Sequence, residues 1–204
     1  HDKNVILEVE KIASVEEVKW EGNESLITII GKELDEAYVR MVKGLSVFPE
    51  VIKKNSDLKI VYTPIHGTGI VMVPRVLESF GFKNVQVVQE QSQPDGDFPT
   101  VAYPNPEESE AMSLGLKMAE QIDADILCGT DPDADRIAIG VKDLKGKWML
   151  MNGNQTAVLA FNYLIEARKT KGIARPNDMV ISTIVTTPMI GVIAKENKVG
   201  YYEV

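Results

Sequence analysis

Three aspartates alternate with other residues in the segment Asp131-Pro132-Asp133-Ala134-Asp135-Arg136, and a guanidinium follows them directly. At an effective dielectric constant of about 20, two like charges about 4 Å apart repel each other by roughly 4 kcal/mol. A divalent cation removes this repulsion, and carboxylate oxygens are the ligands that Mg²⁺, Ca²⁺ and Mn²⁺ prefer. The segment therefore predicts a cation site with Asp131, Asp133 and Asp135 as ligands.

Other uses of an acidic loop fit this segment less well. An EF-hand also has carboxylates at positions 1, 3 and 5, but it needs glycine at position 6 and glutamate at position 12. Arg136 and Lys142 stand there, and strands rather than helices are predicted on both sides, so an EF-hand is excluded. A phosphatase of the haloacid dehalogenase type places its nucleophilic aspartate after an early strand, which suits this position poorly. A solvated acidic turn remains the plain alternative to a cation site.

A β-α-β pattern precedes the aspartates. Residues 58–63 and 85–88 are predicted strands around a helix over 71–80, in which Pro74 is tolerable only in the first turn. Such a unit is typical of a parallel sheet covered by helices. A third strand over 125–129 ends at the aspartates, which matters because ligands bind at the carboxyl ends of parallel strands.

The remaining elements predict a three-layer α/β/α fold with a mixed, mainly parallel sheet and an incomplete second α/β unit. Short strands are expected in residues 1–36, as the tail of a preceding domain. Residues 37–146 are predicted to form the central domain and 147–204 the beginning of another. Further strands are expected at 137–141, 147–151, 179–186 and 199–204, and further helices at 35–47 (capped by Asp35), 105–121 (capped by Asn105), 155–169 and 189–196.

Composition excludes several classes of partner. The 204 residues carry a net charge of −8 with a sequence pI of about 4.9, and no basic cluster occurs, which argues against nucleic acid and anionic membranes. No window has the roughly 18 apolar residues of a membrane span. The single cysteine, Cys128, fits a reducing, cytoplasmic setting and a buried structural role. The ends, His-Asp-Lys-Asn and Tyr-Tyr-Glu-Val, suggest a piece of a longer protein.

Two further groups have candidate roles. Arg136 is expected to neutralise the aspartates, to bind phosphate, or to do both, because a guanidinium offers five donors and stays protonated. His66 lies in the segment Pro64-Ile65-His66-Gly67-Thr68-Gly69 after the first strand of the β-α-β unit. Such a loop can present N–H groups to an anion. A tight turn in which His66 bonds to backbone is the favoured interpretation.

Three motifs together resemble the α-D-phosphohexomutases, the phosphoglucomutases and phosphomannomutases. They are, in chain order, Tyr62-Thr63-Pro64-Ile65-His66-Gly67-Thr68-Gly69, Pro104-Asn105-Pro106-Glu107-Glu108 and Gly129-Thr130-Asp131-Pro132-Asp133-Ala134-Asp135-Arg136. The resemblance extends over essentially the whole chain and assigns it to the second domain, with the end of the first and the start of the third. It implies four domains around one cleft and a phosphoserine that exchanges phosphoryl groups with a hexose phosphate through a bisphosphate intermediate.

The resemblance also implies roles for single residues. Asp131, Asp133 and Asp135 correspond to the Mg²⁺ ligands, which hold the metal together with the serine phosphate. Arg136, with Asp135, corresponds to contacts with phosphate or sugar. Phosphoryl transfer depends mainly on charge neutralisation and in-line positioning, which suits such a site.

The chain departs from the family pattern where the nucleophile should be. It contains no Thr-Ala-Ser-His-Asn-Pro-type loop, so the catalytic serine is absent, and the sugar-selecting and phosphate-binding segments are absent too. The expected partners are a glucose or mannose phosphate and the missing domains of the same chain, and the chain by itself is predicted to be inactive. A non-catalytic cation-binding or interaction module and a metal-dependent sugar-phosphate phosphatase are the alternatives.

Overall fold

The computed structural model describes residues 1–204, which divide into two compact units, His1–Asp35 and Glu36–Val204. The larger unit contains a five-stranded sheet with the strand order β2-β1-β3-β4-β5. Its strands are β1 (Lys59–Thr63), β2 (Asn84–Val87), β3 (Ile126–Thr130), β4 (Ile137–Lys142) and β5 (Trp148–Met151). Strand β1 pairs in parallel with β2 and β3, whereas β4 is antiparallel to both β3 and β5. The predicted mixed, mainly parallel sheet is confirmed.

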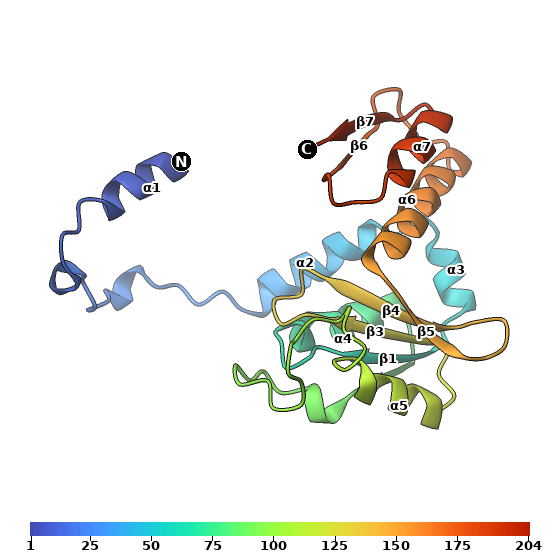
Figure 1. The fold of residues 1–204 in the computed structure, drawn as a ribbon, viewed down its shortest axis with the longest axis horizontal. Helices are drawn as coiled ribbons and strands as arrows, with labels where there is room; N and C mark the ends of the chain where they lie inside the picture. Colours follow the sequence, from blue (N-terminus) through green and yellow to red (C-terminus); the bar gives the residue numbers. More distant parts are fainter. The chain divides into compact units, whose positions relative to one another are not determined.

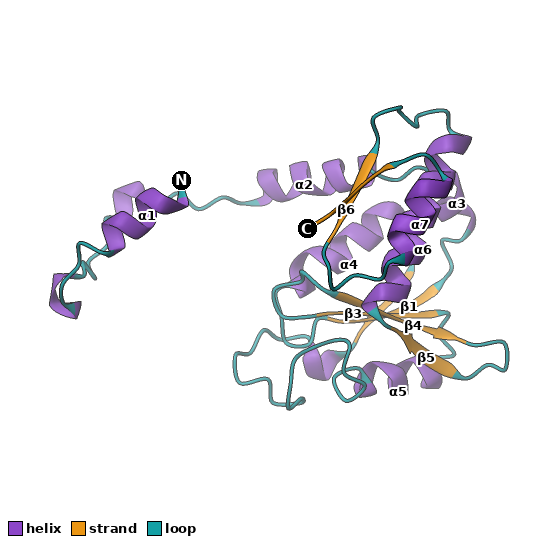
Figure 2. Cartoon of the chain, turned by 45° about the horizontal axis from the view of Figure 1, so that its top comes forward, coloured by secondary structure: helices purple, strands orange, loops and turns teal.

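Helices cover both faces of this sheet (Figures 1 and 2). Helix α5 (Ser113–Gln121) packs on β1 and β3 from one side, while α4 (Gly69–Phe80) and α6 (Gly153–Thr170) lie on the other. Two more helices, α2 (Lys32–Gly44) and α3 (Pro49–Lys54), precede β1. The three-layer α/β/α arrangement expected from the alternation of strands and helices is confirmed.

The core beneath α5 is built from small and medium side chains. Its fully buried members are Val61, Ile65, Val88, Ala111, Met112, Ala119, Ala124, Leu127 and Ala138. Two glycines let the layers approach closely: a Cβ on Gly115 would lie 2.8 Å from a methyl carbon of Leu127, and one on Gly129 would overlap the sulfur of Met112. Close packing of this kind leaves little room for larger residues.

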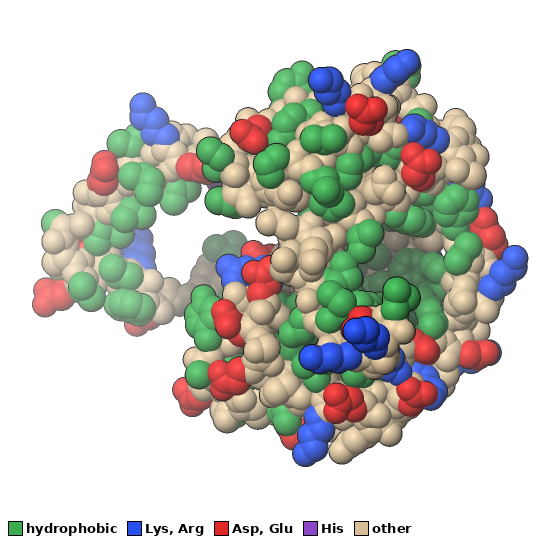
Figure 3. Space-filling view, turned by 45° about the vertical axis from the view of Figure 1, so that its right-hand side comes forward, with side chains coloured by type: hydrophobic (Ala, Val, Ile, Leu, Met, Phe, Trp, Pro, Cys, Tyr) green, Lys and Arg blue, Asp and Glu red, His purple; other side chains and the backbone are tan.

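A second, smaller sheet follows α6. Strands β6 (Met179–Ser182) and β7 (Gly200–Glu203) pair in parallel, and α7 (Met189–Glu196) connects them. Helix α7 packs on both strands and on α6. Ile181 and Tyr202 remain about 60% exposed, and Figure 3 shows hydrophobic side chains at the molecular surface among charged ones. This is the incomplete second α/β unit that the sequence predicts.

The strands predicted in residues 1–36 are wrong. The smaller unit contains α1 (Asp2–Val9) and two short 3₁₀ turns, Val15–Glu17 and Glu24–Leu26, and its apolar side chains stay exposed, including Trp20 at 79% and Ile29 at 88%. A strand needs a neighbouring strand for its backbone hydrogen bonds, whereas a helix satisfies them locally. Without a partner strand, the same apolar runs take helical and turn conformations.

Two helix starts are also corrected. The helix expected from Asn105 begins only at Ser113; the Asn105 side chain accepts a hydrogen bond from the Glu107 N–H (3.0 Å) in a local turn instead. Helix α2 begins at Lys32, so Asp35 lies inside its first turn and is not its cap. The short helix α3 was not predicted.

Pro74 lies deeper in its helix than the sequence suggests. Helix α4 begins at Gly69, two residues earlier than expected, which places Pro74 in the second turn. The proline ring nitrogen cannot donate a hydrogen bond to the carbonyl of the preceding turn, and this weakens the helix locally. Pro74 is therefore tolerated outside the first turn, contrary to the expectation.

The domain boundaries at 36/37 and 146/147 stay a prediction. Within the larger unit, β5 pairs with β4 and is the last strand of the five-stranded sheet. Helix α6 follows β5 in the chain and precedes β6 of the second sheet. None of the helices combines the length and the apolar character that a membrane crossing requires.

Leu127 gives a direct test of the core on which the aspartate loop rests. It is fully buried on β3, whereas Leu144 is fully exposed in the turn between β4 and β5. We expect Leu127→Ala to lower the free energy of unfolding by about 2–5 kcal/mol, because it leaves a cavity. The matched Leu144→Ala should change it by less than about 0.5 kcal/mol. Urea unfolding of both variants measures the difference, and equal effects would contradict this packing.

Candidate functional site

The three aspartates form one cluster in the loop between β3 and β4. One carboxylate oxygen from each of Asp131, Asp133 and Asp135 lies within 4.8 Å of the others. Asp131 is buried, with 6% exposure, and the other two are exposed. A cation with metal–oxygen bonds of about 2.1–2.4 Å joins oxygens up to about 4–5 Å apart, so the donor set and its spacing suit Mg²⁺ or Ca²⁺.

The loop backbone turns the carboxylates toward one another. The Ala134 N–H donates to the Asp131 carbonyl (3.1 Å), and Ala134 takes a left-handed conformation with φ 61°. The Arg136 N–H donates to Asp131 Oδ1 (3.0 Å), which fixes the buried carboxylate. A non-glycine residue in the left-handed region costs about 1–2 kcal/mol, and the surrounding contacts must compensate for it.

Negative charge exceeds positive charge in the cluster, because three carboxylates lie beside one guanidinium. The pKa of Asp135 is raised, chiefly by hydrogen bonding with Asp131 and then by the negative charges of Asp133 and Asp131. The guanidinium of Arg136 opposes this only in part: its Nε lies 3.7 Å from Asp131 Oδ2 and 3.8 Å from Asp135 Oδ1. Arg136 thus lies beside the aspartates, and its side chain is half exposed; its predicted contact with phosphate stays a prediction.

The loop after β1 supports the aspartate loop from the neighbouring strand. The Thr68 N–H and hydroxyl both donate to the Pro132 carbonyl, at 2.8 and 3.1 Å. A Cβ on Gly67 would meet the Pro132 backbone, so only glycine permits this approach. Below the contact, the hydroxyls of Tyr62 and Thr130 form a buried hydrogen bond of 2.8 Å. The Gly-Thr-Gly segment therefore contacts and supports the aspartate loop, which its sequence did not reveal.

His66 is tied into the protein, as the favoured interpretation predicted. The residue is 4% exposed. Its Nδ1 lies 3.1 Å from the Gln93 carbonyl oxygen, and its Nε2 lies 2.9 Å from the Thr100 hydroxyl. Gln91, fully buried, donates to Thr100 (3.1 Å) and accepts from the Thr63 hydroxyl (2.6 Å). These bonds hold the loop after β1 against the long segment that follows β2.

The Asn105-to-Glu108 motif acts on the start of α6. Glu107 Oε1 accepts a hydrogen bond from the Gly153 N–H (2.9 Å), across 46 residues of sequence. A carboxylate at a helix N-terminus satisfies a free donor and complements the helix dipole. Sequence reasoning missed this contact, because Glu107 was placed in the first turn of a helix of its own.

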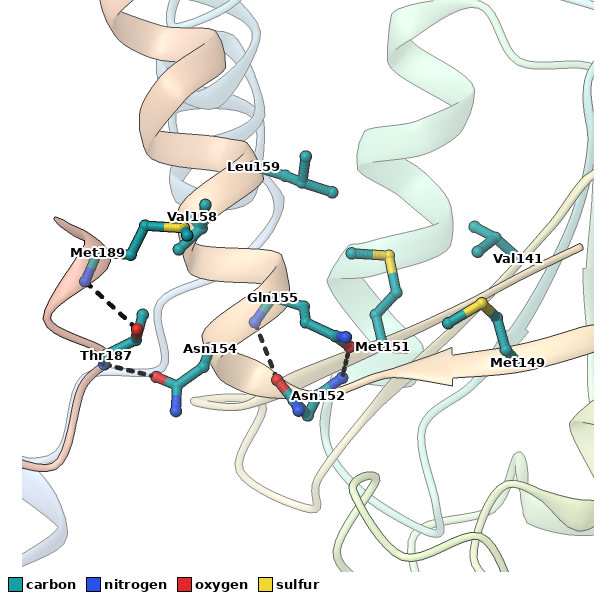
Figure 4. Close-up of a pocket in the computed structure, with 10 residues that line it drawn as sticks. All are labelled: Val141, Met149, Met151, Asn152, Asn154, Gln155, Val158, Leu159, Thr187 and Met189. Carbon is teal, nitrogen blue, oxygen red and sulfur yellow. Dashed lines mark hydrogen bonds between the residues drawn. The ribbon is translucent and has the colours of Figure 1, made fainter. Parts of the chain in front are cut away.

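The start of α6 also borders a cavity of about 490 Å³ (Figure 4). Asn152 and Gln155 form a reciprocal capping box, and the Asn154 side chain accepts a hydrogen bond from the Thr187 N–H (2.9 Å), which ties α6 to the turn before α7. The other walls are apolar and include Met149, Met151, Val158, Leu159 and Met189. The polar groups bond to one another, and none of the three aspartates lines this cavity.

Cys128 has the inert role predicted from its neighbours. It lies on β3, and burial raises the pKa of its thiol to about 11. At neutral pH the side chain is therefore a thiol rather than the reactive thiolate.

The fold is that of an α/β domain in which three carboxylates gather at the carboxyl end of a parallel strand. A family model described as "Phosphoglucomutase/phosphomannomutase, alpha/beta/alpha domain II" matches residues 36–146. The chain belongs to this family of phosphoglucomutases and phosphomannomutases, as its three motifs suggested.

Relatives named as phosphoglucomutases agree with this family assignment. The chain is 38% identical over 182 residues to a phosphoglucomutase of Staphylococcus epidermidis and 34% identical over 182 residues to one of Staphylococcus aureus. Each match covers 89% of this chain but only 32% of the relative, so the chain spans about a third of their length. In fold it is similar to the crystal structure of a phosphoglucomutase/phosphomannomutase family protein from Burkholderia thailandensis, with a TM-score of 0.59, 18% identity, and coverage of 83% of this chain and 32% of that one.

Gly67 tests whether the two loops depend on their close approach. An added Cβ would lie 2.3 Å from Pro132 Cα, whereas one on Gly96 would meet no heavy atom within 4 Å. We expect Gly67→Ala to lower the free energy of unfolding by about 1–3 kcal/mol, because the loops must move apart. Gly96→Ala should be close to neutral. Chemical denaturation compares the two, and a Gly67→Ala protein as stable as the control would disprove the contact.

Proposed function

We propose that this chain is the metal-holding part of a Mg²⁺-dependent phosphohexomutase, whose full-length form interconverts a hexose 1-phosphate and a hexose 6-phosphate. The observation that carries the proposal is the convergence of Asp131, Asp133 and Asp135 at the carboxyl end of β3, in a chain of this family. The names of the relatives favour glucose phosphate as substrate, with mannose phosphate as the alternative that the family description includes.

The residues present suit a hard divalent cation. All three donors are carboxylates, one of them buried and fixed by a backbone N–H, and their mutual repulsion disappears once a cation is bound. When bound, Mg²⁺ supplies positive charge at the transferring phosphoryl group. Arg136 would add a second positive group beside it and, with Asp135, contact phosphate or sugar.

The remaining machinery belongs to the proposed parent protein. We infer that a serine outside these 204 residues carries the phosphoryl group, and that a bisphosphate intermediate reorients between two transfers. The missing domains of the same chain are then the partners of this one. A protein whose one cysteine is a partly buried, free thiol fits a reducing cytoplasm, which we propose as its location.

Mg²⁺ should stabilise the chain through the aspartates. Binding to the native state alone raises stability by mass action, and we expect millimolar Mg²⁺ to raise the melting temperature by about 1–3 °C. Asp133→Asn should remove most of this shift, while Asp97→Asn, at another exposed aspartate, should keep it. Thermal melting with EDTA and with Mg²⁺ measures the effect. An equal shift in both variants would argue against the site.

The rise in melting temperature caused by Mg²⁺ should depend on pH. Because the pKa of Asp135 is raised, this carboxyl takes up a proton at a higher pH than an ordinary aspartate does. A proton competes with the cation, so the Mg²⁺-dependent shift should decline as the pH falls toward that range. The protonated cluster is also relieved of repulsion, so the metal-free protein should lose stability as the pH rises through the same range.

The chain by itself should show no mutase activity. The chain contains no segment of the Thr-Ala-Ser-His-Asn-Pro type, so we infer that it lacks the nucleophilic serine. A coupled assay from glucose 1-phosphate to glucose 6-phosphate should give no turnover above background, with a full-length relative as the positive control. Substantial turnover would refute the proposal that the nucleophilic serine lies outside these 204 residues. Net release of inorganic phosphate would instead indicate a phosphatase.

A further inference from the structure

A second cavity, of about 430 Å³, lies in the C-terminal part of the chain, between the later turns of α6 and the starts of β6 and β7. Figure 1 shows these elements next to one another. Its apolar walls are Phe161, Leu164, Ile165, Met179, Val180 and Val199. The volume is within the range of about 300–1,000 Å³ that is typical of small-molecule sites.

This cavity is separate from the candidate metal site. It lies at the amino ends of β6 and β7, whereas the aspartates follow the carboxyl end of β3. It contains no residue of the aspartate loop and none of the loop after β1. The proposed phosphohexomutase function neither uses nor requires it.

The cavity is positively charged in an acidic protein. Four cationic side chains line it, against a single carboxylate, although the chain as a whole has a net charge of −8. The cations are Arg168, Lys169, Arg175 and Lys198. A local excess of positive charge in a partly apolar hollow favours an anionic ligand.

Two of the four cations are already engaged. Arg168 holds Asp178 through three hydrogen bonds of 3.1–3.2 Å. The pKa of Asp178 is lowered, first by the hydrogen bond from the Arg175 N–H and then by Arg168, so this carboxylate stays ionised. Lys169 donates to the side-chain oxygen of Asn197 and lies 3.4 Å from Glu166.

The other two cations are available. Neither the Arg175 guanidinium nor the Lys198 ammonium group forms a salt bridge or side-chain hydrogen bond, and both residues are exposed at the cavity rim. The one acidic group of the lining, Asp178, is occupied by Arg168 and by the Arg175 backbone. A guanidinium and an ammonium group that line the same cavity can supply the donors and the charge that a phosphate dianion requires.

We propose that this cavity binds an organic monophosphate, with an apolar body against the α6 and β6 side chains and its phosphate between Arg175 and Lys198. The apolar walls account for the body, and the two unengaged cations account for the charge. An uncharged apolar molecule would leave the cations without a partner. Inorganic phosphate would leave the apolar walls in water.

The test uses the 204-residue chain in EDTA, which removes divalent cations from the aspartates. 1-Naphthyl phosphate is the probe, titrated by calorimetry or by its own fluorescence, with 1-naphthol and inorganic phosphate as partial ligands. Arg175→Ala/Lys198→Ala removes both rim cations, and Lys145→Ala/Lys147→Ala removes two exposed charges from the turn between β4 and β5. Arg136→Ala reports on binding at the aspartate loop. Thermal melting verifies that each variant is folded.

We expect the rim double variant to bind 1-naphthyl phosphate about tenfold more weakly or worse, because it loses two charged donors. The Lys145/Lys147 and Arg136 variants should bind it as the unaltered chain does, and both partial ligands should bind much more weakly. Unchanged affinity in the rim variant, equal affinity for 1-naphthol, or loss of binding in Arg136→Ala would each overturn the proposal. None of these results depends on mutase activity or on Mg²⁺ binding, so failure here is distinguishable from failure of the proposed function.

Discussion

The contact between Thr68 and the Pro132 carbonyl joins the loops that leave two neighbouring parallel strands, and the candidate site depends on it. The carbonyl belongs to the residue between Asp131 and Asp133, so fixing it fixes the direction in which both carboxylates leave the backbone. Gly67 permits the approach, and the buried Tyr62–Thr130 hydrogen bond aligns the two strand ends beneath it. The aspartate loop is therefore positioned from outside as well as by its own hydrogen bonds.

Buried polar side chains keep the supporting loop in place. Thr63 and Gln91 are fully buried and bond to each other, and Gln91 continues the chain of bonds to Thr100, which also contacts His66. Each such bond contributes only about 1 kcal/mol net, but leaving a buried partner unsatisfied costs about 1–3 kcal/mol. A loop conformation that broke one of these bonds and left its partner buried would therefore cost more free energy than the bond itself contributes.

Sequence reasoning succeeded where local pattern decides structure, and failed where distant contacts decide it. The strands of the central sheet are apolar runs between turn residues, and the aspartate cluster lies within six consecutive residues, so both were readable. Glu107 was placed in a helix because Asn105 and Pro106 form a typical helix start, yet its carboxylate bonds to Gly153, 46 residues away. Likewise, nothing local to Gly67 shows that it faces Pro132. Residues 1–36 have strand-like runs, but strand formation depends on a partner that this chain does not provide.

The aspartate loop holds like charges closer together than they would lie on their own. Ala134 has a left-handed backbone, the pKa of Asp135 is raised by its acidic neighbours, and Arg136 offsets their charge only from 3.7–3.8 Å. These costs fall on the folded state before any ligand arrives, and the core and loop contacts described above compensate for them. A preorganised site of this kind has a more favourable free energy of cation binding, because folding has already brought its ligands together. The C-terminal cavity has the opposite balance of charge, because its lining has four cations and one carboxylate, and we propose that it binds an anion instead.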